Sequence, residues 1–310
     1  MKIAVIGTGY WGKNHVRDYC GMGNEVVACD LKQENLLYCQ QNFPIVHATA
    51  SIDEVLADRS IKAVSVCLPN QLHFDVAKKC LLASKHVLLE KPMCLSSREC
   101  MKLVKIAKKK NLVLNIGHVF RFNNAIIKLK EMVEKKELGR IFLCKLVWTN
   151  LEQIFPDRDI LFDLAPHPFD IVNFVFSKNP QQVSAIGKEF RKKDGEEAAF
   201  VNALLDGILV NLEISWITPE KKRTITVVGE KKSVFVDALS QKIEVFENET
   251  KQRTELSFVP SNSLTEELRH FIDCIENGNA PTADGMVGYH IIYAIEKALE
   301  SLRKGKVLKA

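Results

Sequence analysis

The 310-residue sequence lacks the features of several specialised classes of protein. It has no uncharged apolar run as long as a membrane span, which argues against a transmembrane helix. Its nine cysteines are odd in number and form no Cys-x-x-Cys pair, so we expect small core residues in a reducing compartment and no zinc or other metal site. No internal repeat and no low-complexity linker is present.

A large excess of charge of one sign is also missing. Forty-three Lys and Arg face thirty-eight Asp and Glu, a net charge of only +5. The short basic clusters contain no interleaved aromatic residues, so we expect solvated ends of helices or turns and no nucleic-acid partner; they are 108–110, 221–223 and 231–232. The chain begins with a strand pattern and not with a basic-then-apolar leader, so we expect a cytoplasmic protein without a membrane partner.

The first thirty residues contain the most informative pattern. An apolar run at 2–6 leads into Gly7-x-Gly9-x-x-Gly12, and a second apolar run follows at 25–29. Gly7 permits a tight turn out of the first strand, Gly9 leaves no side chain between the backbone and a pyrophosphate, and Gly12 lets the following helix lie close to the sheet. This order of strand, glycine turn, helix and strand predicts a dinucleotide site.

An acidic residue completes the pattern. Asp30 ends the second strand, where its carboxylate can accept hydrogen bonds from both ribose hydroxyls and would repel a 2′-phosphate, so we expect NAD in preference to NADP. The helix that starts near Tyr10 directs its free N–H groups and positive dipole end at the phosphates. The alternative interpretation is a purely structural turn in another doubly wound domain.

Alternating strand and helix patterns continue to about residue 117, so we expect an α/β protein whose N-terminal domain, residues 1–119, is a Rossmann doubly wound parallel sheet of about six strands. Strand-like runs dominate afterwards to about residue 260, and short polar turns such as Asp206-Gly207 join them. Residues 120–310 therefore form a second, α+β domain with a large, mostly antiparallel open sheet. We expect the last helix to pack back on the first domain.

The strands of the second domain are rich in apolar residues. Phe200, Val201, Leu212 and Ile214 suggest an open sheet face that would be unusual in contact with water. We therefore expect a homodimer or homotetramer that assembles through this C-terminal sheet.

Polar segments follow the last three apolar strands of the first domain, at 69–73, 90–92 and 117–123. In a doubly wound sheet, ligands bind beyond the carboxyl ends of the strands. Lys91 ends a buried strand and precedes Pro92, which holds it at such a cleft. The alternative is a structural lysine that pairs with Glu90.

A second candidate lies at 163–170. Pro168 suits the first turn of a helix, which places His167 at its entrance about one turn after Asp163. A histidine in a cleft can exchange a proton near neutral pH, and a nearby carboxylate can orient it. A structural cap is the alternative interpretation of this pair.

These motifs together resemble the Gfo/Idh/MocA oxidoreductases over essentially the full length of the chain. The similarity comprises the glycine turn, Pro69-Asn70, Glu90-Lys91-Pro92, the segment 117–123, Asp163-x-x-x-His167 and the tail from 264 to 301. The resemblance implies hydride transfer between NAD and a sugar or cyclitol carbinol, with His167 as general base, Lys91 as hydrogen-bond donor to the same oxygen and Asp163 as orienting group.

The resemblance also implies a set of cofactor contacts. They are Gly7, Gly9, Tyr10, Trp11, Gly12, Asp30, Leu68, Pro69, Asn70, His73, Glu90 and Lys91. Trp11 would flank the nicotinamide.

Within the family, the segments 9–14 and 117–123 resemble the branch that oxidises C3 of UDP-N-acetylglucosamine or UDP-N-acetylglucosaminuronate. His118, Arg121 and Asn123 would then contact the sugar or its phosphates. Arg158 could meet a diphosphate or uronate, or form a surface ion pair. Two alternatives stay open: an inositol or free-sugar dehydrogenase of the same family, and a non-catalytic sensor that binds NAD and a sugar.

Overall fold

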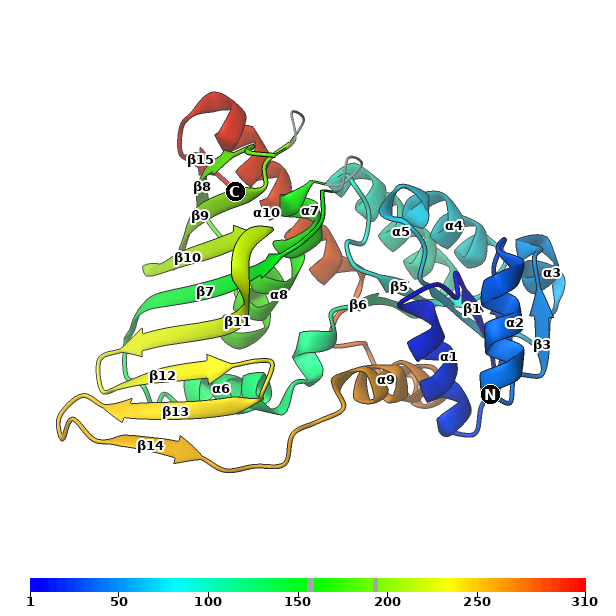
Figure 1. The fold of residues 1–310 in the computed structure, drawn as a ribbon, viewed down its shortest axis with the longest axis horizontal. Helices are drawn as coiled ribbons and strands as arrows, with labels where there is room; N and C mark the ends of the chain where they lie inside the picture. The colour runs from blue at the N-terminus through cyan, green and yellow to red at the C-terminus, as the bar shows by residue number, and fades with distance from the viewer. Residues whose placement is uncertain (155–158, 192–194) are drawn as a thin grey trace. The chain divides into compact units, whose positions relative to one another are not determined.

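The protein is described here by a computed structural model that covers residues 1–154, 159–191 and 195–310. The chain forms two compact units (Figure 1). Unit 1 contains Met1–Val119 and Leu264–Ile292, and unit 2 contains Phe120–Ser263 and Tyr293–Ala310.

Unit 1 is built on a parallel six-stranded sheet with the order β3-β2-β1-β4-β5-β6. The order reverses between β1 and β4, which is where a doubly wound sheet opens a crevice at the carboxyl ends of its strands. The predicted Rossmann architecture is confirmed. The strands are β1 (Lys2–Ile6), β2 (Glu25–Cys29), β3 (His47–Thr49), β4 (Ala63–Val66), β5 (His86–Glu90) and β6 (Leu114–Gly117).

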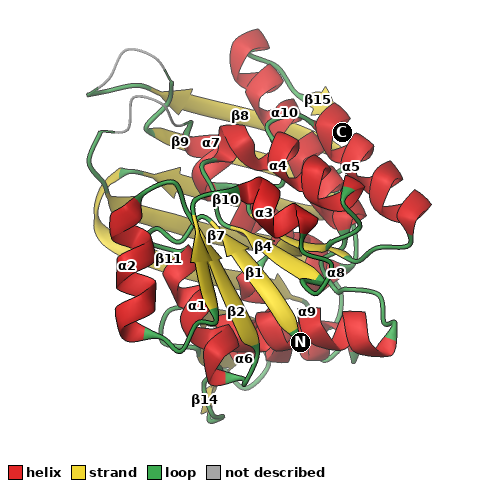
Figure 2. Cartoon of the chain, turned by 90° about the vertical axis from the view of Figure 1, so that its right-hand side faces the viewer, coloured by secondary structure: helices red, strands yellow, loops and turns green. Residues whose placement is uncertain are grey.

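Helices connect these strands, as Figure 2 shows for the part of the sheet around β1, β2 and β4. Two of them start at serine caps, because the Ser51 and Ser96 hydroxyls accept hydrogen bonds from the amides three residues later. The helices are α1 (Gly12–Gly21), α2 (Gln33–Asn42), α3 (Ile52–Ala57), α4 (Asn70–Leu82), α5 (Ser97–Lys110), α9 (Ser263–Asn277) and α10 (Gly285–Lys304), the last of which continues into unit 2.

Helix α9 returns to unit 1 from late in the chain. Its Leu268 and Phe271 are fully buried in one core with Val16 and Tyr19 of α1, and Figure 1 shows the two helices side by side. Burying a side chain of this size contributes about 1.5–3 kcal/mol, so α9 is an integral layer of the nucleotide-binding unit.

Unit 2 contains a nine-stranded sheet with the order β14-β13-β12-β11-β7-β10-β9-β8-β15. All neighbours are antiparallel except β7 and β10, so the predicted mostly antiparallel sheet is confirmed. The strands are β7 (Ile141–Leu151), β8 (Gln182–Lys188), β9 (Ala198–Leu205), β10 (Ile208–Ser215), β11 (Ile217–Gly229), β12 (Lys232–Asp237), β13 (Lys242–Glu247), β14 (Arg253–Leu256) and β15 (Leu308–Lys309).

Short helices and one tight turn complete unit 2. The helical elements are the 3-10 turn η1 (Val119–Phe122), α6 (Asn124–Glu134), α7 (Ile160–Leu164) and α8 (Pro166–Phe176). Helices α6 and α8 pack on each other and lie behind the sheet in Figure 1. Asp206 and Gly207 adopt positive φ angles of 50° and 82°, as the predicted hairpin turn between β9 and β10 requires.

The structure corrects the prediction that four apolar residues lie on one open face of this sheet. Val201, Leu212 and Ile214 are buried, whereas Phe200 is 48% exposed on the opposite face. Successive residues of a strand point to opposite faces, so the adjacent apolar pair at 200 and 201 could not reveal which face is covered. Ile186, paired with Phe200, and Leu209 are also exposed apolar residues of this sheet.

The structure adds one helix that was not predicted, α7. Helix α8 has Pro168 in its first turn, as predicted, and begins two residues earlier, at Pro166. In the basic cluster at 221–223, Lys221 and Lys222 are exposed but Arg223 is buried, because it pairs with the buried Trp148 of β7 and begins the alternating buried positions of β11. In the described part of the chain, no helix is both long and apolar enough to cross a membrane.

Candidate active site

The glycine turn after β1 has the shape of a phosphate cradle. A Cβ on Gly7 would lie 2.5 Å from the Cys67 carbonyl oxygen, and one on Gly12 would lie 1.8 Å from the Gly7 carbonyl oxygen. A Cβ on Gly9 would meet no atom within 4 Å, so the space beside this residue is open. The turn is therefore closed at its base and open where a pyrophosphate would approach the backbone, and Tyr10 beside it is exposed.

Asp30 is fixed next to this turn. Its Oδ2 accepts hydrogen bonds from the Thr8 amide at 2.7 Å and from Asn35 Nδ2 at 3.0 Å, and its Oδ1 accepts one from the Lys32 amide at 2.8 Å. These donors hold the carboxylate at the end of β2, at the position expected of a ribose ligand. The ribose contact itself stays a prediction.

Glu90 connects the glycine turn to the segment after β5. Its Oε1 accepts a hydrogen bond from Trp11 Nε1 at 2.8 Å and lies 3.1 Å from His15 Nε2, and its Oε2 accepts one from the Lys91 amide at 3.2 Å. Burial alone would raise the pKa of Glu90, but His15 and Trp11 outweigh it and leave the pKa below its usual value. A Cβ on Gly117 would lie 2.8 Å from Oε1, so a side chain at this position of β6 would displace the Glu90 carboxylate.

The segments that follow β4 and β5 are joined by His73. Its ring nitrogens lie 2.7 Å from the Pro92 carbonyl oxygen and 2.8 Å from the Leu68 carbonyl oxygen, and burial lowers the pKa of the imidazole. Pro69 immediately precedes α4, which begins at Asn70. Lys91 follows β5 directly and is joined to Pro92 by a cis peptide bond. The predicted cofactor and catalytic residues of unit 1 therefore all lie at the carboxyl ends of its strands.

Asp163 and His167 lie on consecutive helices of unit 2. Helix α7 starts at an Asp159 cap, whose carboxylate accepts hydrogen bonds from the Leu161 and Phe162 amides, and it carries Asp163 in its first turn. His167 is the second residue of α8. Its imidazole packs edge-on against Phe120 at a centroid distance of 5.1 Å and tilts over Trp148 at 6.3 Å.

Asp163 is oriented by Trp216, which directly follows β10. Trp216 Nε1 donates to Asp163 Oδ2 at 3.2 Å, and the indole is 1% exposed. Backbone bonds fix Trp216 in turn, because its amide donates to the Glu197 carbonyl oxygen and its carbonyl oxygen accepts from the Glu152 amide. One carboxylate oxygen of Asp163 is thus held by a rigid donor.

Arg121 is engaged within unit 2. Its Nε donates to Asp170 Oδ1 and its Nη2 donates to Asn173 Oδ1, both at 2.7 Å. The guanidinium is buried and lies 5.1 Å from the centre of the Phe174 ring. All three partners belong to α8, so Arg121 holds the helix that carries His167.

The remaining predicted substrate residues have different surroundings. Asn123 is buried, caps α6 and donates through Nδ2 to the Ala238 carbonyl oxygen at 2.9 Å. His118 belongs to unit 1, is buried, and its amide donates to the Ile116 carbonyl oxygen. Their substrate contacts stay predictions. Arg158 lies outside the described residues.

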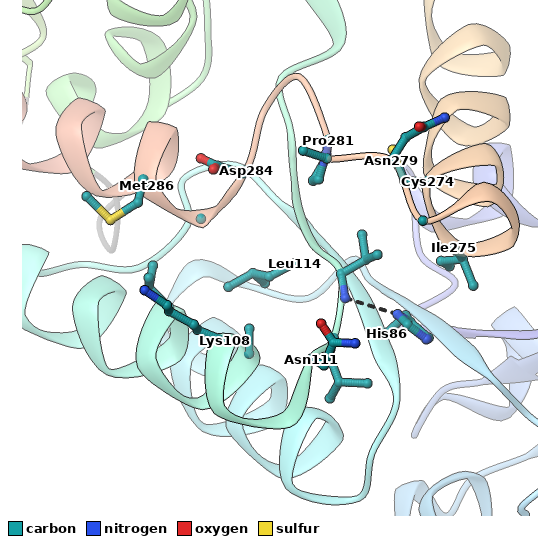
Figure 3. A pocket seen from close by; sticks show the side chains of 17 residues that line it. His86, Lys108, Asn111, Leu114, Cys274, Ile275, Asn279, Pro281, Asp284 and Met286 are labelled. Carbon is teal, nitrogen blue, oxygen red and sulfur yellow. Dashed lines mark hydrogen bonds between the residues drawn. The ribbon is translucent and has the colours of Figure 1, made fainter.

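A groove of about 500 Å³ occupies a different part of unit 1. Figure 3 shows it lined by Lys108 of α5, by Asn111 directly after this helix and by Leu114 at the start of β6, with His86 at the start of β5. It therefore lies at the amino ends of these strands, and the motif residues lie at the carboxyl ends. Among the described residues, no group of three or more His, Cys, Asp or Glu side chains is arranged to hold a metal ion.

Comparison with known families decides the relationship. Residues 1–118 match the model of an oxidoreductase family with an NAD-binding Rossmann fold, and residues 126–235 match the GFO/IDH/MocA C-terminal domain. The chain belongs to the GFO/IDH/MocA family. Unit 1 is accordingly an NAD-binding domain, and the open space beside Gly9 fits that cofactor.

Relatives within the family differ in substrate. The chain is 25% identical to myo-inositol 2-dehydrogenase of Thermotoga maritima, over 99% of this chain and 98% of the relative. It is also 25% identical to UDP-N-acetylglucosamine 3-dehydrogenase of Acidithiobacillus ferrooxidans, over 95% of both chains. A solved structure of the latter matches with a TM-score of 0.87 at 24% identity and 98% coverage of each chain.

A third match is more distant in sequence. The structure of a levoglucosan dehydrogenase with NADH and levoglucosan has a TM-score of 0.92 at 17% identity, covering 100% of this chain and 99% of that one. Such a similarity shows the shared fold alone.

Three residues of this GFO/IDH/MocA protein that lie around the predicted site residues were not predicted: Trp148 contacts His167, Trp216 contacts Asp163, and Arg223 contacts Trp148. A usable signal was the scarcity of tryptophan. The chain has only three, and each contacts a residue of the motifs: Trp11 contacts Glu90, Trp148 contacts His167, and Trp216 contacts Asp163. Arg223 carried no such signal, because its cluster of three basic residues is typical of a solvated turn.

Proposed function

We propose that this protein is an NAD-dependent sugar dehydrogenase that oxidises a carbinol of a nucleotide sugar, at C3 of a UDP-N-acetylhexosamine or its uronate. Membership of the family indicates an NAD-binding oxidoreductase with dehydrogenase relatives. The proposal adds the substrate and the position that is oxidised. Similarity to a UDP-N-acetylglucosamine 3-dehydrogenase over 95% of both chains supports the nucleotide sugar.

One observation carries the proposal. Asp163 and His167 lie on consecutive short helices, and each is held by an aromatic residue from the sheet beneath them, Trp216 and Trp148. A structural cap would not need two separately oriented polar groups on adjacent helices. This arrangement is what a positioned base and an orienting carboxylate require.

Each residue then has a defined task. His167 accepts the proton of the reacting hydroxyl, and Lys91 donates a hydrogen bond to the same oxygen as negative charge develops on it. Asp163, whose carboxylate Trp216 holds in place, orients a hydroxyl of the sugar. NAD, when bound at the glycine turn, accepts the hydride.

The test is NADH production by the purified protein with a panel of substrates. The panel contains UDP-N-acetylglucosamine, its uronate, free hexoses and inositols. We expect kcat/KM for a UDP-sugar to exceed that for any free sugar or inositol by at least about tenfold. NADH formation with no member of the panel would contradict the proposal and favour a non-catalytic sensor.

A second candidate function is favoured by one observation. The myo-inositol 2-dehydrogenase relative is as similar to this chain as the nucleotide-sugar enzyme is. An inositol or free-sugar dehydrogenase would use the same Lys91, Asp163 and His167. In the panel it would reverse the order of kcat/KM between inositol and the UDP-sugars.

We also propose that the open face of the unit 2 sheet binds a second copy of the chain, in a dimer or tetramer. The exposed apolar residues Ile186, Phe200 and Leu209 support this, because a second copy would remove them from water. Polar pairs lie near them: Lys145 of the neighbouring strand β7 lies 3.5 Å from Glu213 of β10, and Asn211 of β10 donates to Asn202 of β9. Sedimentation equilibrium measures the mass directly, and a monomer at micromolar concentration would contradict the assembly.

A further inference from the structure

Arg223 is a buried cation on the covered face of the unit 2 sheet. It lies on β11, is 9% exposed and pairs in register with Trp148 of β7. Its guanidinium carbon lies 5.5 Å from the centre of the Trp148 ring. The same ring lies against His167, so Arg223 and His167 are both neighbours of one indole.

The hydrogen bonds of Arg223 are all to neutral acceptors. Nη1 donates to the carbonyl oxygens of Thr149 and Lys222, each at 2.8 Å, and Nη2 donates to Asn150 Oδ1 at 3.0 Å. A guanidinium has five N–H groups, so two of them form no hydrogen bond to a described residue. In the described part of unit 2, Arg223 also forms no ion pair with a carboxylate.

Buried arginines without an ion pair are rare, because a desolvated charge is costly. The surroundings of Arg223 show this cost. Burial lowers the pKa of its guanidinium to about 10, and the more distant Asp163 and Glu152 offset only part of the effect. Both carboxylates are engaged elsewhere, Asp163 with Trp216 and Glu152 with Asn150 Nδ2.

We propose that Arg223 is a specificity-determining residue that binds an anionic oxygen group of the substrate, a sugar carboxylate or a nucleotide diphosphate. The inference rests on the proposed dehydrogenase function. Two N–H groups of one guanidinium match the paired oxygens of a carboxylate or phosphate, and Trp148 places them near His167. Arg121, which the sequence favours for this contact, is already paired with Asp170.

The experiment compares Arg223→Gln with the wild-type enzyme on four substrates. They are UDP-N-acetylglucosaminuronate, UDP-N-acetylglucosamine, free N-acetylglucosamine and myo-inositol, with NAD in each case. Arg253→Gln is the matched control, because Arg253 lies on β14 of the same sheet and its side chain is 61% exposed. Steady-state kcat and KM are measured together with thermal stability.

A carboxylate contact predicts that Arg223→Gln lowers kcat/KM for the uronate about thirtyfold more than for UDP-N-acetylglucosamine. A diphosphate contact predicts a loss of about thirtyfold for both UDP-sugars and little change for the free sugar or inositol. Either result supports the proposal. An equal loss on all four substrates, or no loss on any of them, would overturn it.

Two further measurements keep the inference testable if Arg223→Gln does not fold. Arg223→Lys keeps the charge, so it should retain most of the discrimination between anionic and neutral substrates. Wild-type enzyme should itself prefer an anionic over a neutral substrate by at least about tenfold in kcat/KM. Absence of that preference in an active enzyme would overturn the anion site, whereas inactivity on every substrate would instead contradict the dehydrogenase function.

Discussion

The two units differ in how their functional residues are encoded. In unit 1, the polar residues of interest directly follow buried strands, because a parallel sheet brings all carboxyl ends of its strands to one edge. In unit 2, Asp163 and His167 obtain their partners from other elements: Trp216 from the bend between β10 and β11, and Trp148 from β7. The site residues of the parallel sheet can therefore be located from the strand pattern of the sequence. Those of the mostly antiparallel sheet cannot, because their partners come from separate segments of the chain.

The largest expected effect tests whether the two units contribute equally to the reaction. Lys91→Ala should lower kcat about a hundredfold or more, because the developing charge on the substrate oxygen loses its donor. His167→Asn should produce a loss of similar size and abolish the rise of rate with pH that a neutral imidazole base produces. Steady-state rates between pH 6 and 9 measure both.

The control for this pair is Lys79→Ala, at an exposed position of α4. NAD affinity, measured by fluorescence titration, should be nearly unchanged in Lys91→Ala, since the cradle for the phosphates is intact. An active Lys91→Ala enzyme would remove this lysine from the reaction. Persistence of the pH rise in His167→Asn would assign the base to another group.

Most elements of unit 1 could be predicted because several local signals agree there. Strand and helix alternate, Ser51 and Ser96 mark helix starts, and the glycine turn fixes the first crossover. The return of α9 to this unit had no local signal. Its apolar stripe fits any core, and only packing against Val16 and Tyr19 decides which one it joins.

In unit 2, the strands were predictable and their faces were not. Phe200 and Val201 are adjacent and both apolar, so the strand pattern does not say which of them faces the helices. Helix α7 has only five residues, too few for a helical period to be recognised. Arg223 became a site residue only once pairing with β7 placed it over Trp148.

A second prediction tests the separate roles of two glycines in the turn after β1. Gly9→Ala should keep the fold, since its Cβ meets no atom within 4 Å, but should weaken NAD binding about tenfold by occupying the approach of the pyrophosphate. Gly12→Ala should instead lower the stability by about 1–3 kcal/mol, because its Cβ would lie 1.8 Å from a carbonyl oxygen. Thermal melts with and without NAD separate the two effects.

Gly21→Ala provides the matched control for these two variants. Gly21 ends α1, and its Cβ would also meet no atom within 4 Å. It should leave the affinity for NAD unchanged and should not lower the melting temperature, because alanine is more favourable than glycine in a helix. A Gly9→Ala protein with unchanged NAD affinity would mean that the pyrophosphate does not approach this turn.

The last prediction concerns Glu90, which joins the glycine turn of unit 1 to the segment after β5. Its pKa is lower in the folded protein than the usual value of 4.5, because the contacts with His15 and Trp11 outweigh burial. The charged carboxylate therefore stabilises the fold fully above about pH 4.5, and this contribution is lost as the pH falls through the folded pKa. Glu90→Gln should lower the free energy of unfolding at pH 7 by about 1–3 kcal/mol.

The difference between Glu90→Gln and wild type should shrink below pH 4.5, since protonation then removes the same charge from the wild-type protein. Urea unfolding at pH 7 and at pH 3.5 measures it, with Glu25→Gln, at an exposed position of β2, as the control for loss of a surface charge. A difference that is equal at both pH values would mean that Glu90 acts through packing alone. The positions of Trp11 and Lys91 would then depend on side-chain packing and not on hydrogen bonds to the buried Glu90 carboxylate.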